Sequence, residues 1–440
     1  MSATFNFFQH WYPLLPVADL TPDRPISTQL LGQPIAIWKP TSSDHYRAFL
    51  DRCPHRLAPL SEGRVDPKTG HLECCYHGWQ FDENGTCTKI PQAENAELLE
   101  RNCEQLRATA LPTCVANDLF WVWPDPDSAE LAAQTPLSLS PKIDNSKGFV
   151  WSSYVRDLPY DWQTLVENIA DPSHVPFAHH GVQGSRESAT PIPMKIQEAT
   201  PERIVAQIDR NFPSTMTFEP PCRLEYAIQL GSEEKQIGLI TYCIPTAPGK
   251  SRIVAQFARN FALRAKDLTP RWWEHIRLRH LVLDGDMVLL HCQEAALREE
   301  GHWKSAYMMP TNADRFVIAF RKWFENNCDQ YIPWQGVGST VAPPSPVEAR
   351  REVLLDRYHQ HTQICPDCQG ALKRIQQLKG GTLVTAAILV LVIALLPDAS
   401  RLLVGLPCGA IALFSAGIWG WLNYRLEPQF YFVDYVHAER

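Results

Sequence analysis

Residues 53–79 read CPHRLAPLSEGRVDPKTGHLECCYHGW and contain two short loops that each offer one thiolate and one imidazole. The first loop carries Cys53 and His55, and the second carries Cys74 and His77. Two such loops facing each other are suited to one tetrahedral zinc ion, or to two irons bridged by sulfides. In the iron interpretation, Cys53 and Cys74 bind one iron while His55 and His77 bind the other.

The two loops resemble the Rieske [2Fe–2S] signature of the ring-hydroxylating oxygenases. This resemblance implies a cluster with a higher reduction potential than a four-cysteine cluster, because two neutral imidazoles replace two thiolates. Cys75 would give a shorter Cys-x-His spacing, so Cys74 is the favoured ligand and Cys75 the alternative. The other cysteines outside the tail motif described below are expected to be ordinary buried thiols: Cys87, Cys103, Cys114, Cys222, Cys243, Cys292, Cys328 and Cys408.

Short apolar runs broken by proline, glycine and aspartate surround this signature. The runs 34–38 and 119–123 are typical of strands. We therefore predict an all-β domain over residues 1–130, which the resemblance identifies as a Rieske domain.

Residues 131–331 mix strand-like runs with helical patterns, so an α+β domain is expected there. The resemblance implies a helix-grip-like catalytic domain that holds mononuclear iron. The strands are expected at 204–208, 237–244 and 316–320, and the clearest helices at 160–170 and 271–299.

A second pair of histidines lies in this domain, within ENIADPSHVPFAH at residues 167–179. On a regular helix, His174 and His179 would point about 140° apart and would be poorly placed for one metal. Pro176 lies between them and prevents a regular helix, so both imidazoles could converge at a broken helix end. Two histidines and one carboxylate leave open positions on Fe(II), which is the arrangement that binds O₂.

The same run resembles the mononuclear-iron motif of Rieske oxygenases, Asn-x-x-Asp-x-x-His-x₄-His. The resemblance implies that His174 and His179 are ligands of a non-haem Fe(II). It also makes Asp171 a carboxylate that bridges to a Rieske histidine of a neighbouring subunit in a homotrimer. Asn168 is expected to line the site.

The third iron ligand is expected on a long helix that contains LDGDMVLLHCQ, residues 283–293. Asp286 and Gln293 are seven residues apart and therefore share one helix face. The family's acidic ligand precedes a glutamine at this spacing, which favours Asp286. Asp284 is the alternative.

Two apolar spans near the C-terminus, 380–396 and 402–422, each have the length that a membrane helix needs. The polar turn 397–401 between them predicts a helical hairpin, and the alternative is a buried hairpin of a soluble fold. Flanking cations place the body of the chain on the cytoplasmic or stromal side. These cations are Lys373, Arg374, Lys379 and Arg425.

Composition excludes other classes of protein. The chain has 41 Lys and Arg against 48 Asp and Glu, and its net charge of −7 argues against a nucleic-acid partner. No glycine-rich dinucleotide fingerprint follows a strand, so we expect no nicotinamide or flavin cofactor. Residues 1–11 lack a basic start followed by an apolar run, so we expect no signal peptide and a reducing compartment, in which clustered Cys and His bind metals.

The tail contains Cys365-Pro366-Asp367-Cys368, which suits a dithiol switch or half of a zinc site. A helix start is expected at 345–348, within a linker and helical segment that spans 332–379. The hairpin (380–422) and a C-terminal tail (423–440) follow this motif. A Cys-x-x-Cys before a C-terminal hairpin resembles one branch of the Rieske oxygenases. That branch includes pheophorbide a oxygenase, chlorophyllide a oxygenase and a translocon-associated Rieske protein. The opening Trp11-Tyr12-Pro13 adds to this resemblance, which spans essentially the whole chain.

This resemblance implies a membrane-anchored monooxygenase that takes electrons from ferredoxin and inserts oxygen from O₂ into a chlorin. The expected reaction is the opening of pheophorbide a in chlorophyll breakdown, at a cyanobacterial or plastid membrane. The alternatives are the same chemistry on another chlorin, a sterol or a quaternary amine. A further alternative is a redox-sensing or translocon-associated protein that uses the cluster and Cys365/Cys368 without catalysis.

Overall fold

The structure, a computed structural model, describes most of the chain and groups it into two units. The described residues are 5–94, 104–210, 212–231, 234–264, 268–328, 332–334 and 350–440. The first unit comprises residues 1–268 and 289–348, and the second comprises 269–288 and 349–440. Cys103 and the helix start predicted at 345–348 lie outside the described residues.

Three small antiparallel sheets form the N-terminal part of the first unit, and the predicted strands 34–38 and 119–123 are confirmed as β3 and β11. Trp38 in β3 and Phe49 in β4 pack edge to face, and both are fully or almost fully buried. The sheet orders are β1-β11-β10, β2-β3-β4-β9 and β5-β6-β7-β8. The strands are β1 (Tyr12–Pro16), β2 (Ile26–Leu30), β3 (Gln33–Trp38), β4 (Arg47–Leu50), β5 (Arg64–Val65), β6 (Leu72–Glu73), β7 (Gln80–Phe81), β8 (Cys87–Lys89), β9 (Ala110–Leu111), β10 (Thr113–Ala116) and β11 (Leu119–Val122).

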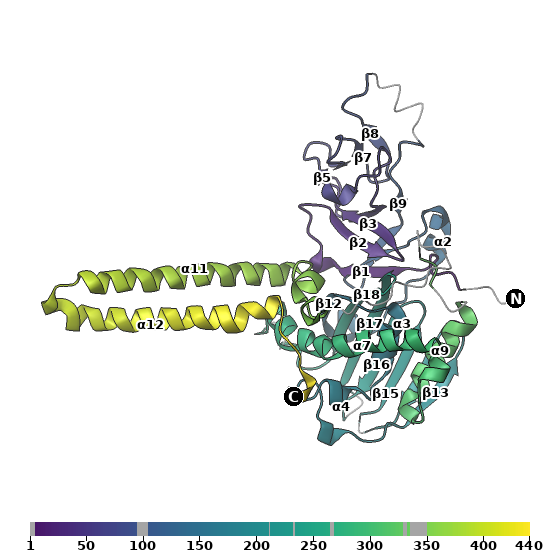
Figure 1. Ribbon diagram of the computed structural model, residues 1–440. Coiled ribbons are helices and arrows are strands. Elements are labelled where there is room, and N and C mark those ends of the chain that lie inside the picture. The colour runs from purple at the N-terminus through teal and green to yellow at the C-terminus, as the bar shows by residue number, and fades with distance from the viewer. Residues whose placement is uncertain are drawn as a thin grey trace. The chain divides into compact units, whose positions relative to one another are not determined.

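A seven-stranded antiparallel sheet forms the rest of the first unit's framework (Figure 1). Its order is β12-β18-β17-β16-β15-β14-β13, so all strands but β12 follow one another as neighbours. The strands expected at 204–208 and 237–244 are confirmed as β14 and part of β17. The seven strands are β12 (Val150–Leu158), β13 (Met194–Ala199), β14 (Ile204–Ile208), β15 (Ser214–Glu219), β16 (Arg223–Gln229), β17 (Gln236–Ala247) and β18 (Lys250–Arg259).

Helices α3 (Trp162–Ala170) and α9 (Arg315–Asn327) pack against this sheet and against each other. The α+β fold class is therefore confirmed, but the strand predicted at 316–320 is wrong because these residues belong to α9. Phe316, Val317 and Phe320 are all buried, and this spacing of one and four residues follows the helical period rather than alternation. Five apolar residues cannot distinguish the two periods. Among its described residues, this unit also contains the short helices α2 (Ala129–Gln134), α4 (Val175–Ala178) and α8 (Trp303–Ala306).

The helix expected at 271–299 is present but interrupted. Helix α6 (Arg271–Glu274) passes into a π-helical turn at 275–279, and α7 (His280–Glu300) follows. The buried side chains of α7 include Leu283, Met287 and Leu290, which form one stripe along the helix. Cys292 lies away from that stripe and is exposed, so its expected burial is wrong. Cys114 and Cys408 are only partly buried because the first is on an edge strand and the second on the apolar hairpin.

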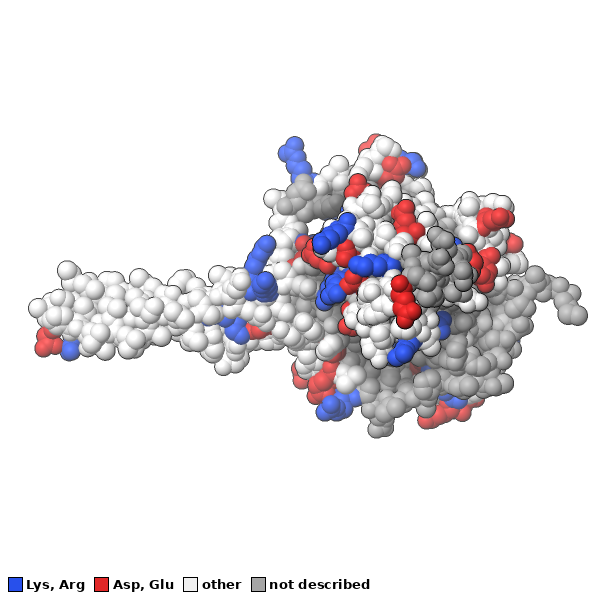
Figure 2. Space-filling model, turned by 90° about the horizontal axis from the view of Figure 1, so that it is seen from above, with Lys and Arg blue, Asp and Glu red and all other residues white. Residues whose placement is uncertain are grey.

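The second unit ends in a hairpin of two long antiparallel helices, α11 (Pro366–Leu395) and α12 (Leu406–Trp421) (Figure 1). The helical stretches Pro366–Leu395 and Asp398–Phe430, which contain α11 and α12, are long and apolar enough to cross a membrane by length and composition. Figure 2 shows the visible face of the hairpin almost free of charge apart from its tip, where Asp398 and Arg401 form an ion pair of 2.9 Å. The short α10 (Arg351–Leu354) and a π-helical turn at 358–362 precede α11.

Candidate active site

The two cysteine–histidine loops share one backbone conformation. In the first, the N–H of Leu57 donates to the Cys53 carbonyl at 2.8 Å; in the second, the N–H of Gly78 donates to the Cys74 carbonyl at 3.0 Å. Both closing residues have a positive φ, 61° at Leu57 and 71° at Gly78, which is a conformation that favours glycine. The second loop therefore matches the first when Cys74, rather than Cys75, is set equivalent to Cys53.

The side chains support the same pairing. Cys53 and Cys74 are each 2% exposed, whereas Cys75 is exposed. The His55 and His77 rings lie with their centroids 4.4 Å apart. Among the described residues, the buried Nδ1 of His55 has no hydrogen-bond partner, as expected of a nitrogen reserved for a metal. This donor set of two thiols and two imidazoles fits a Rieske cluster.

Electrostatics separates the two sides of this cluster site. Burial, reinforced by the nearby Cys74, raises the pKa of the Cys53 thiol to about 12, so its thiolate requires the positive charge of a bound metal. His55 and His77 are only partly buried, and Tyr76 beside them is exposed. The histidine side is therefore the more exposed side of the site.

The structure also brings together the two histidines of the second motif. His174 immediately precedes the one-turn helix α4, Pro176 lies in that turn, and His179 follows it. Their Nε2 atoms are 3.2 Å apart, close to the ~3 Å between two imidazole nitrogens that bind one metal at right angles. The broken helix thus places both nitrogens as a metal requires.

Asp171 stands beside this histidine pair. Its carboxylate accepts a hydrogen bond from the N–H of Ser173 at 2.7 Å and lies 3.6 Å from Nδ1 of His174. Burial alone would raise the pKa of Asp171, but its contacts with His174 and Ser173 outweigh burial and lower the pKa. The side chain keeps 30% of its surface exposed, while Asn168 at the end of α3 is 7% exposed.

The two acidic candidates for the third ligand have different surroundings in the second unit. Asp284 is fully buried and accepts hydrogen bonds from Nε and Nη2 of Arg357 at 2.8 and 2.6 Å. A carboxylate paired in this way would leave a buried guanidinium without its partner if it moved to a metal. Asp286 is 4% exposed on the same helix, α7. Asp286 therefore stays the predicted ligand.

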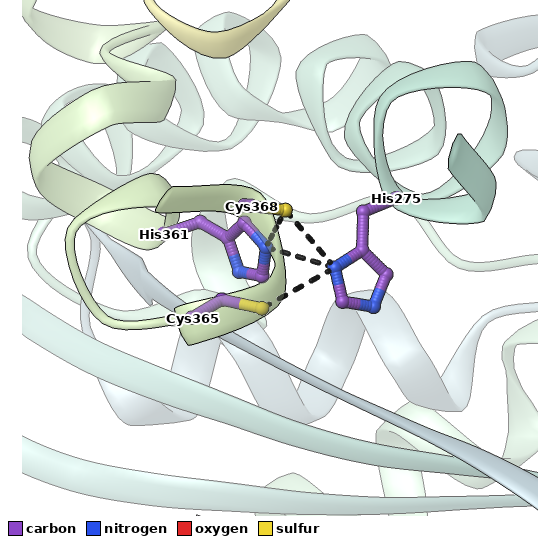
Figure 3. Close-up of side chains that lie close together, drawn as sticks. All are labelled: His275, His361, Cys365 and Cys368. Atoms are coloured by element: carbon purple, nitrogen blue, oxygen red, sulfur yellow. Dashed lines mark hydrogen bonds between the residues drawn. The ribbon is translucent and has the colours of Figure 1, made fainter. Parts of the chain in front are cut away.

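Cys365 and Cys368 are both buried, with Cys365 at the N-cap of α11 and Cys368 in its first turn. They lie beside His275 and His361, which the sequence motifs did not predict to be part of a site (Figure 3). One signal was present, because His361 precedes Cys365 by four residues in the spacing His-x₃-Cys-x₂-Cys. His275 is 86 residues before His361, and no local pattern connects it to the motif.

Comparison with known proteins assigns the chain to a family. A sequence model of the Rieske [2Fe-2S] domain matches residues 10–109, and one described as pheophorbide a oxygenase matches 218–304. The chain is 39% identical to chloroplastic pheophorbide a oxygenase of Oryza sativa subsp. japonica, covering 99% of this chain and 85% of that protein.

Two further proteins place the chain more broadly. It is 34% identical to chloroplastic flavonoid 8-hydroxylase 2 of Ocimum basilicum, covering 99% of this chain and 86% of the relative. The solved structure of dicamba monooxygenase bound to dicamba shares the fold, with a TM-score of 0.59 and 19% identity over 74% of this chain and 98% of that one. The chain therefore belongs to the pheophorbide a oxygenase family of Rieske-type oxygenases.

Proposed function

We propose that this protein is a membrane-anchored, ferredoxin-dependent monooxygenase that opens the macrocycle of pheophorbide a. The observation that carries the proposal is the presence, in one chain, of a Rieske-type ligand set and a pair of histidines whose Nε2 atoms lie 3.2 Å apart. The near full-length similarity to pheophorbide a oxygenase supports pheophorbide a as the substrate.

Each predicted site residue has a role in this proposal. His174, His179 and Asp286 would hold a non-haem iron, which supplies O₂ activation, while the cluster bound by Cys53, His55, Cys74 and His77 supplies electrons. Asp171 keeps the His174 ring oriented from its Nδ1 side, which leaves Nε2 to face His179. Asn168 would shape the site from the end of α3.

The partly exposed carboxylate of Asp171 supports a homotrimer. A carboxylate that links only groups within its own subunit does not need to be exposed. A carboxylate that contacts a Rieske histidine of the next subunit must lie at the surface where the two subunits meet. The oxygenases that this chain resembles use such a link. We therefore propose that electrons pass from the cluster of one subunit through Asp171 of its neighbour.

The α11–α12 hairpin supports a membrane anchor. Large apolar side chains along it are exposed, including Leu391 at 63%, Leu403 at 85% and Leu413 at 77%. Lipid would remove this apolar surface from water. Cations flank the open end of the hairpin, so the catalytic body would face the cytoplasm or stroma. A broad, apolar chlorin also partitions into membrane, and an anchored enzyme meets it there.

Turnover with labelled oxygen tests the reaction. Full-length protein purified without oxygen is given ¹⁸O₂, reduced ferredoxin and, separately, pheophorbide a, chlorophyllide a and a flavone. We expect label in an opened product from pheophorbide a alone. Oxygen consumption without product from every chlorin, or hydroxylation of the flavone alone, would contradict the proposed substrate.

An Asp286→Ala variant is the control in the same assay. It should lose product formation and mononuclear iron while its Rieske spectrum stays unchanged. A redox-sensing protein that does not oxygenate would make no labelled product even in the unaltered chain. Unchanged iron content in the variant would instead indicate that Asp284, and not Asp286, is the third iron ligand.

A further inference from the structure

The second unit contains a group of four buried side chains that the oxygenase reaction does not use. His275, His361, Cys365 and Cys368 each direct one ligand atom to a common point, and all four atoms lie within 4.8 Å of one another (Figure 3). The two cysteines come from the start of α11, His361 from the turn before it, and His275 from the turn after α6. Three separate segments thus converge here.

The distances within this group match the edges of a tetrahedron around one ion. Nε2 of His361 is 3.0 Å from Nδ1 of His275, and Sγ of Cys368 is 3.5 Å from Nδ1 of His275 and 3.4 Å from Nε2 of His361. Sγ of Cys365 is 3.8 Å from Nδ1 of His275. A tetrahedral zinc with ordinary Zn–S and Zn–N bonds requires ~3.3 Å between nitrogens and ~3.6 Å between nitrogen and sulfur.

The backbone gives a second, independent observation. Both histidines lie in π-helical turns, His275 in 275–279 and His361 in 358–362. A π-helical turn contains one more residue than an α-helical turn, and such turns occur frequently at functional sites. Both interruptions coincide with the residues that face the cysteines.

The surroundings of the group exclude solvent. All four side chains are buried, and Ile276, Leu372 and Phe430 belong to the apolar cluster that contains both cysteines. Where two thiols and two imidazoles are buried together in an apolar setting, a bound cation is one way to satisfy them away from water. Four protein ligands complete a tetrahedron and leave no open position, which is the arrangement of a structural rather than a catalytic site.

We propose that His275, His361, Cys365 and Cys368 form a structural zinc site that fastens the base of the C-terminal hairpin to the helix that carries His275. Zinc accounts for the mixed nitrogen and sulfur ligands and the tetrahedral spacing. A single ion accounts for the short distances. The site is separate from the irons of the proposed oxygenase, so it holds whatever the substrate is.

Element-specific measurements on the full-length, detergent-solubilised protein test this proposal. Metal analysis should find about one zinc per chain in addition to iron, and zinc X-ray absorption should show two sulfur and two nitrogen neighbours. Neither readout depends on a variant that folds, or on turnover. A chain that contains iron but no zinc, or a Cys365–Cys368 disulfide in protein purified under argon, would overturn the proposal.

Variants then locate the ion. Cys368→Ser and His275→Ala should each lower the zinc content at least tenfold while leaving the Rieske spectrum intact. His359→Ala is the matched control, because His359 lies in the same turn as His361 but is 69% exposed and faces Asp356. It should keep its full zinc. Equal zinc in all three variants would place the metal elsewhere and refute the site.

Discussion

Cys74 and Cys75 are adjacent in the sequence, yet only Cys74 has the environment of an iron ligand. Cys74 is buried, and its loop repeats the hydrogen bonds that surround Cys53, whereas Cys75 points to solvent. A Cys74→Ala variant should therefore lose the visible absorption and EPR signal of the Rieske cluster. Cys75→Ala should keep both signals and, as a surface change, shift stability by no more than about 0.5 kcal/mol. Loss of the cluster in Cys75→Ala alone would reverse the assignment.

Single residues also mark the boundary of what the sequence can predict. The spacing of the Rieske loops and of His174 and His179 is local, and a short sequence window contains all the information that positions them. His275 and Arg357 are different, because their partners lie 86 and 73 residues away along the chain. Only the folded chain brings His275 to Cys368, and only it shows that Asp284 is already paired.

At the scale of secondary-structure elements, the sequence distinguishes a strand from a helix by the period of its apolar residues. Helix α9 shows that a window of five residues is too short to reveal that period. A strand over 316–320 would place Phe316, Ile318 and Phe320 on one face, whereas the helix buries Phe316, Val317 and Phe320 and leaves Ile318 partly exposed. The helices predicted at 160–170 and 271–299 are long enough to show their period, and both are present. The π-helical turn at 275–279 could not be predicted, because no local residue pattern requires it.

This difference in period gives a stability prediction for α9. Phe320 packs against Trp162 and Phe218 with ring centroids 5.6 and 5.4 Å apart, so Phe320→Ala should lower the free energy of unfolding by about 3–5 kcal/mol. Ile318→Ala removes a partly exposed side chain and should cost clearly less. Chemical denaturation followed by tryptophan fluorescence measures both. Equal losses in the two variants would indicate that residues 316–320 alternate as a strand does.

Across the whole molecule, the proposed electron path makes the oligomer the unit of activity. If the cluster of one subunit supplies the mononuclear site of the next, a subunit that lacks one centre can still serve its neighbour. Cys53→Ser removes the cluster and keeps His174, whereas His174→Ala removes an iron ligand and keeps the cluster. Each variant alone should therefore be inactive, and a mixture should not be.

Co-expression of the two variants should restore a defined fraction of the normal rate. In cyclic trimers assembled at random from equal amounts of the two variants, an interface is active when the His174→Ala subunit supplies the cluster and the Cys53→Ser subunit supplies the mononuclear site. About a quarter of the interfaces have this order, so about a quarter of the normal rate should return. Mixing the separately purified variants controls for subunit exchange after assembly. Adding Asp171→Asn to the Cys53→Ser chain should abolish the recovered activity, because the proposed electron link is the Asp171 of the subunit that receives the electron. An inactive co-expressed mixture, with both variants shown to share oligomers, would mean that each subunit supplies its own mononuclear site and that Asp171 does not act across an interface.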